Sequence, residues 1–91
     1  MTETNELLNE RGKRYGTFKR HARVSQALKR SIVEHIDEQQ KVLEPYQAEA
    51  LEMICHKIAR IVNGDPNYID SWADIAGYAT LVVKTLQGEE I

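Results

Sequence analysis

The 91-residue sequence contains only one cysteine, two prolines and one tryptophan. A single cysteine, Cys55, excludes an intrachain disulfide framework and fits a reducing compartment. No apolar run approaches the roughly 18 residues of a membrane span. The polar, acidic start, Met1 to Glu6, does not have the pattern of a secretory signal. There is also no glycine-rich phosphate loop and no Ser-His-Asp or Cys-His arrangement of a nucleophile and its base. We therefore expect a cytoplasmic protein without a membrane span.

The length corresponds to a single domain over residues 1–91. Apolar residues recur near the 3.6-residue period, which predicts helices, and no segment alternates as a strand would. Four helices are expected, over Glu3–Arg14, Thr17–Gln39, Pro45–Asn63 and from about Asn67 to just before Gly88. Thr17 is the expected N-cap of the second helix, and Asn67 or Asp70 that of the fourth.

The fourth predicted helix is apolar or small nearly all round. Its main stripe comprises Trp72, Ile75, Ala79, Val82, Val83 and Leu86, and its other side carries Gly77, Tyr78 and Leu81. We expect the main stripe to pack in the core. A helix of this kind is normally covered on two sides, and a chain that buries only about 60–65% of its unfolded surface offers little cover. The sequence therefore predicts a small all-α bundle of about four helices that is completed by homo-oligomerisation.

Charge is strongly segregated along the chain. The 23 residues from Arg11 to Val33 contain eight lysines and arginines and no acid, whereas the rest carries four bases and fourteen acids. The net charge of −2 therefore combines a +8 segment with a −10 remainder. Such segregation indicates either a site for an anion or a basic surface that pairs with acidic parts of the same or another subunit. A solvated helix face is the plainer alternative.

Within the basic segment, aromatic and basic side chains are interleaved, a pattern that can stack a nucleobase and pair with its phosphates. The turn residue Tyr15 should be open, whereas Phe18 is expected in the core. Two bases of the third helix lie one turn apart and add further cations for a phosphate. The candidate phosphate-binding residues are Arg11, Tyr15, His21, Lys57 and Arg60. The other histidines, His35 and His56, are expected to be solvated.

Acids in the C-terminal half recur at helical spacings. Glu49 and Glu52 are three positions apart, and Asp70 and Asp74 are four apart, so each pair shares a helix surface. Carboxylates from two antiparallel helices can hold a hard divalent cation such as magnesium, which usually also binds substrate phosphates. We expect these four acids to be metal ligands if the protein is an enzyme, although such pairs are also common on solvated faces.

Three stretches resemble a family of small uncharacterised phage and prophage proteins. They are Arg11-Gly-Lys-Arg-Tyr-Gly16, Lys57-Ile-Ala-Arg60 followed by Gly64-Asp-Pro66, and Asp70-Ser-Trp-Ala-Asp-Ile-Ala-Gly-Tyr78. More distantly, the pattern is similar to the all-α nucleoside triphosphate pyrophosphohydrolases of the MazG and dimeric dUTPase type. That resemblance implies magnesium bound by a Glu-x-x-Glu pair, matched by Glu49 and Glu52, and by a Glu-x-x-Asp pair. Asp74 matches the final aspartate, but Ser71 replaces the glutamate.

The sequence thus favours a phage-type protein that binds a nucleotide or another phosphorylated small molecule, in the cytoplasm of a host cell. A magnesium-dependent enzyme of this kind would direct metal-activated water at a pyrophosphate linkage. One alternative is a non-catalytic protein that sequesters a host nucleotide signal or blocks a defence system. The other is an interaction module whose basic helix contacts protein or a nucleic-acid backbone without reading bases.

Overall fold

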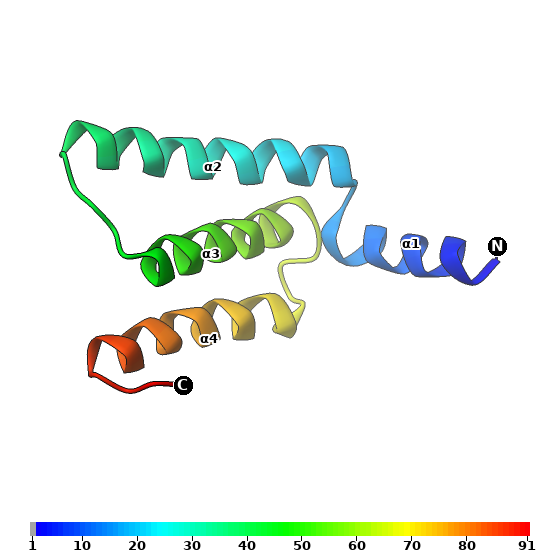
Figure 1. Cartoon of the computed structure of the whole chain (residues 1–91). Coiled ribbons are helices and arrows are strands. Elements are labelled where there is room, and N and C mark those ends of the chain that lie inside the picture. The colour runs from blue at the N-terminus through cyan, green and yellow to red at the C-terminus, as the bar shows by residue number, and fades with distance from the viewer. Residues whose placement is uncertain (1) are drawn as a thin grey trace.

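The structure is a computed structural model that describes residues 2–91, and this range contains four α-helices and no strand (Figure 1). The helices are α1 (Thr2–Tyr15), α2 (Phe18–Glu38), α3 (Pro45–Asn63) and α4 (Ile69–Leu86). The predicted all-α class and the order of the helices are confirmed. No helix in this range is both long and apolar enough to cross a membrane.

The helix ends agree with the predicted caps at α2 and differ from them at α4. Thr17 lies at the N-cap position of α2, but its side chain makes no capping hydrogen bond. α3 begins with a capping box, in which the backbone N–H of Glu44 donates to Gln47 Oε1 at 2.9 Å. The N-cap residue of α4 is Tyr68, so the expected cap at Asn67 or Asp70 is wrong. Asn67 instead belongs to the preceding turn, where its N–H donates to Asp65 Oδ1.

Helices α2, α3 and α4 form a single layer with α3 in the middle, and α1 extends away from one end of that layer (Figure 1). α2 and α4 each pack against α3 and make no contact with one another. A single layer of helices has no second layer to enclose its large side chains. The buried apolar residues are accordingly few, namely Ala50, Cys55, Ala59 and Ile61, and no large side chain in the described chain is fully buried.

α4 presents a different face to α3 than the sequence predicted. Ser71 is buried, and Tyr78 and Val82 line the contact with α3. The expected core residues Trp72 and Leu86 are instead 56% and 64% exposed. Because both sides of α4 are apolar, its periodicity could not decide which side packs against α3. The expectation that the main stripe packs within the chain is therefore wrong for most of its members, although Ile75 and Val82 are half-buried.

Cys55 has the buried position expected of a small hydrophobic residue on α3. Burial raises the pKa of its thiol above the ordinary value, which keeps the thiol protonated and weakly nucleophilic at neutral pH.

Two segments that are far apart in the sequence are bound together, and we call them the turn clasp. They are the end of α1 with its turn into α2 (residues 14–17) and the end of α3 with the start of the following loop (residues 63–65). Asn63 Nδ2 donates to the carbonyl oxygens of Tyr15 at 2.9 Å and Thr17 at 3.1 Å. The N–H of Asp65 donates to the carbonyl oxygen of Arg14 at 2.7 Å. These bonds fix where α1 and the start of α2 lie relative to α3.

Two glycines permit this close approach. Gly16 has a φ of +76°, which glycine adopts at little cost. A Cβ at Gly16 would overlap the backbone oxygen of Asn63, and one at Gly64 would overlap the backbone of Arg14 and Tyr15. Because the obstructing atoms belong to the backbone, no side-chain rotation would relieve these overlaps.

We predict that Gly64→Ala destabilises the protein by about 2 kcal/mol, since the segments of the clasp would have to separate. Gly77→Ala is the matched control. Gly77 lies within α4 with no atom near its Cβ position, so this change should stabilise by roughly 0.5–1 kcal/mol. Urea denaturation followed by circular dichroism measures both, and equal stability of the two variants would contradict the importance of the clasp.

Candidate anion-binding site

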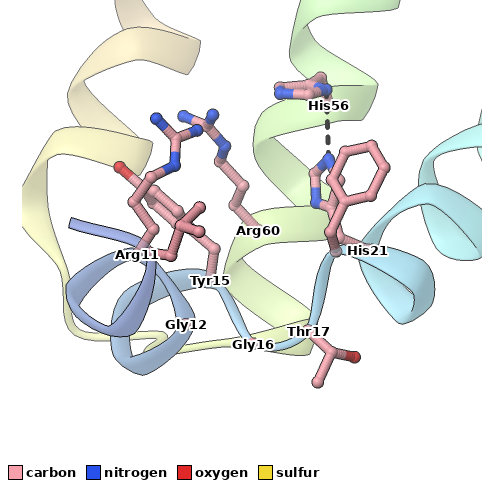
Figure 2. Close-up of a pocket in the computed structure, with 10 residues that line it drawn as sticks. Arg11, Gly12, Tyr15, Gly16, Thr17, His21, His56 and Arg60 are labelled. Carbon is pink, nitrogen blue, oxygen red and sulfur yellow. Dashed lines mark hydrogen bonds between the residues drawn. The ribbon is translucent and has the colours of Figure 1, made fainter. Parts of the chain in front are cut away.

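A pocket of about 430 Å³ lies where the end of α1, the start of α2 and the C-terminal half of α3 meet (Figure 2). Its lining comprises Leu8, Arg11, Gly12, Tyr15, Gly16, Thr17, Phe18, His21, His56 and Arg60. Four of the five predicted phosphate-binding residues are therefore brought together, and Lys57 is the exception. The lining contains no carboxylate.

Two arginines share one aromatic ring in this pocket. The guanidinium carbon of Arg60 lies 4.1 Å from the ring centroid of Tyr15, and that of Arg11 lies 5.6 Å from it (Figure 2). Neither arginine pairs with a carboxylate among residues 2–91, although three other ion pairs form there. Two unpaired cations in one pocket repel each other, and an anion bound between them would remove that repulsion.

Tyr15 is itself held by a chain of aromatic contacts. Its ring meets the ring of Tyr68 edge-on, with centroids 6.1 Å apart. The guanidinium of Arg14 lies 4.2 Å from the Tyr68 centroid, and the Tyr68 hydroxyl donates to Asp70 at 2.8 Å. These contacts link α1, the loop after α3 and the first turn of α4. They give Tyr15 a fixed position against which Arg11 and Arg60 are placed.

A pair of histidines forms another wall of the pocket. His21 Nε2 and His56 Nδ1 are 3.2 Å apart, and the two rings meet edge-on with centroids separated by 4.5 Å (Figure 2). One nitrogen must donate and the other accept, so the pair cannot make this bond with both rings fully protonated. His21 is only 5% exposed, and its Nδ1 has no hydrogen-bond partner among the described residues.

The surroundings disfavour a positive charge on either imidazole. Burial lowers the pKa of His21 below its ordinary value, and the charges of Arg60, Lys29 and Lys57 add to this effect. Burial also lowers the pKa of His56 to about 4, helped by the neighbouring His21 and by the same cations. A bound anion would raise the pKa of both histidines again, because it would offset the surrounding positive charge and could accept a hydrogen bond from a ring N–H.

Phe18 lies at the edge of this pocket and is 80% exposed, so its expected place in the core is wrong. It is the first residue of α2, and the first buried residue of that helix is His21. The ring centroid of Phe18 lies 6.4 Å from that of His21, so the same pocket has an apolar face at one edge and two guanidinium groups on Tyr15. That combination suits a ligand with a planar group and a phosphate.

The predicted metal ligands are not gathered in one place. Glu49 lines a hollow between α3 and α4, whereas Glu52 lines another between α3 and α2. Asp70 accepts the hydrogen bond from Tyr68, and Asp74 binds Lys57. Across residues 2–91, no group of three or more His, Cys, Asp or Glu side chains is placed to hold a metal ion. Magnesium binding by these four acids stays a prediction.

Lys57 lies outside the pocket because it pairs with an acid of α4. Its Nζ is 2.9 Å from Asp74 Oδ2, and its side chain is only 11% exposed. A largely desolvated ammonium needs such a partner. The cation expected to bind phosphate and one of the acids expected to bind metal thus join α3 to α4.

His56 was the functional candidate that the sequence analysis missed. It was expected to be solvated, yet it contacts His21 in the pocket wall. A usable signal was present, because His56 and Arg60 are four positions apart on α3 and so share a surface. Its partner His21 lies 35 residues away in the sequence, and only the packing of α2 on α3 brings the two rings together.

Comparison with known proteins places the chain in a family without assigning it an activity. Residues 1–86 match the family described as a domain of unknown function, DUF6378, and the chain belongs to this family. No curated protein and no solved structure matches the chain. It is therefore a member of a small, uncharacterised domain family. The family does not indicate a function, whereas the geometry of the pocket indicates a class of ligand.

We predict that stability falls as the pH drops from 7.5 to 5. The pKa of both pocket histidines is lowered in the folded chain, so the unfolded chain, with a histidine pKa near 6.5, takes up protons first. This contribution is complete above pH 6.5 and is lost as the pH falls towards 4. Urea denaturation at several pH values measures the slope.

His56→Gln should reduce this slope, while His35→Gln, a change at an exposed residue of α2, should leave it intact. An unchanged slope in His56→Gln would contradict the assignment to the histidine pair.

Proposed function

We propose that the protein binds a phosphorylated small molecule, most specifically a nucleotide, in the pocket between α1, α2 and α3. The observation that carries this proposal is the grouping of two unpaired guanidinium groups and two imidazoles in one pocket without a carboxylate. A neutral ligand would leave the positive charges unbalanced. A phosphate would accept hydrogen bonds from both arginines in their preferred paired geometry.

Different residues of the pocket would bind different parts of the ligand. Arg11 and Arg60 would bind the phosphate oxygens, with their positions set by Tyr15. With His21 Nε2–H donating to His56 Nδ1, the Nε2–H of His56 would be free to donate to the same anion. Phe18, exposed at the edge of the pocket, would stack on a planar base. A volume of about 430 Å³ lies within the range of small-molecule sites.

Catalysis would require more than this pocket provides. The hypothesis of a magnesium-dependent enzyme rests on the resemblance to MazG-type enzymes. In such an enzyme the metal would be bound by Glu49, Glu52, Asp70 and Asp74. Asp74 would first have to leave Lys57. A binding protein that sequesters its nucleotide requires no such rearrangement, and the separate positions of the four acids favour it. On the strength of the resemblance to phage proteins, we expect it to act in the cytoplasm of a bacterial host.

Isothermal titration with the four nucleoside 5′-monophosphates and with inorganic phosphate tests the proposal, each with magnesium and with EDTA. We expect at least one monophosphate to bind and its unphosphorylated nucleoside to bind far more weakly. Arg60→Gln should weaken binding at least about tenfold, because a charge-assisted hydrogen bond contributes about 1.5–3 kcal/mol.

Arg30→Gln is the matched control, since Arg30 is an exposed residue of α2 that does not line the pocket. It removes the same charge and should leave the affinity unchanged. Equal losses in the two variants would show that net charge alone attracts the ligand. Absence of binding by every phosphate compound would contradict the proposal. In a separate assay with nucleoside triphosphates, release of pyrophosphate that requires magnesium would support the enzyme.

A further inference from the structure

The layer of helices has a broad apolar face that residues 2–91 cover only in part. On α3, positions at 100° per residue place Leu51, Ile54, Ile58 and Val62 along one side, between the sides that contact α2 and α4. On α4, the corresponding side carries Trp72, Ile75, Ala79, Val83 and Leu86. We call these nine residues the apolar face. None of them is charged, and five of them are large side chains that are at least one-third exposed.

The exposed area of the chain is too large for a compact monomer. A folded monomer of 10.4 kDa exposes roughly 5,400 Å² by the scaling of surface with mass, whereas this chain exposes 6964 Å². Its radius of gyration is 15.4 Å, against about 12 Å for a compact domain of this length. Some of the excess comes from the projecting α1. The whole excess, roughly 1,500 Å² by this scaling, is larger than the area that one partner contributes to a stable dimer, about 800 Å².

We infer that the apolar face is the interface of a homodimer, in which the helical layers of two chains stack face to face. A second copy suits this face because it brings an equally flat, uncharged layer, and a two-fold axis pairs the same patch on both chains. Trp72, half-exposed in one chain, would become buried between the layers. Stacking supplies the second layer that helical domains use to enclose a core.

The dimer would leave the proposed ligand pocket open. His56 and Arg60 lie roughly 160° around α3 from Ile58, on the other side of the layer. The interface and the pocket therefore have no residue in common, and loss of one need not abolish the other. This separation makes the interface testable whether or not a nucleotide binds.

Light scattering after size exclusion, from 1 to 100 μM, tests the inference on three proteins. The natural chain should have a mass of about twice 10.4 kDa. Val83→Glu puts a charge on the apolar face at a residue that is 52% exposed in the single chain, and it should yield a monomer or fail to fold. Leu81→Glu is the matched control, because Leu81 lies on the opposite side of α4 at 48% exposure.

Leu81→Glu should remain a dimer. Unfolding of Val83→Glu while Leu81→Glu stays folded also supports burial of Val83, since the single chain leaves that side chain accessible. The emission of Trp72 gives a second measurement, and it should shift to longer wavelength on dilution as the dimer dissociates. A monomeric natural chain at 100 μM would overturn the inference, and so would a dimer that survives Val83→Glu but not Leu81→Glu.

Discussion

The clasp between the two segments, residues 14–17 and 63–65, is the constraint from which the arrangement of the site follows. The side-chain amide of Asn63 donates hydrogen bonds to two carbonyl oxygens of the first segment. The absence of a side chain at Gly64 lets its backbone approach that of residues 14 and 15. Together with the aromatic contacts of Tyr15 and Tyr68, this contact holds the C-terminal end of α1 against α3 and the loop after it. The clasp sets α1 across the end of α3, so Arg11 of one helix and Arg60 of the other reach the same tyrosine ring.

The chemistry of the pocket is a consequence of charges that are assembled without their partners. Most cations on a protein surface are balanced by nearby acids or by water. Here the acids of the C-terminal half are directed elsewhere, and Asp74 neutralises Lys57 between α3 and α4. Two arginines and two imidazoles remain together, and the imidazoles are held largely neutral by their surroundings. An anion would balance the charge of both arginines and could accept a hydrogen bond from the histidine pair.

The arrangement of α2, α3 and α4 in a single layer determines which side chains are buried and which are exposed. A layer three helices wide buries small residues such as Ala59 at its seams, but it cannot enclose a tryptophan. The uncharged side of α3 and α4 is consequently exposed in large part, while the other side of α3 carries the pocket residues His56 and Arg60. Binding and assembly would then use opposite sides of one layer, which lets a chain of only 91 residues support both.

The sequence by itself determined the four helices and their bounds to within a few residues, because apolar spacing, Pro45 and the glycines act locally. It also predicted Arg11, Tyr15, His21 and Arg60 as members of one anion site, because cations and aromatics grouped outside an acidic context favour an anion, and these four residues do line one pocket. Tertiary structure decided the rest. It buried Ser71 and exposed Trp72 because α4 is apolar on both sides. It brought His56 to His21 and paired Asp74 with Lys57, because these placements depend on which helices flank α3, and helical periodicity does not contain that information.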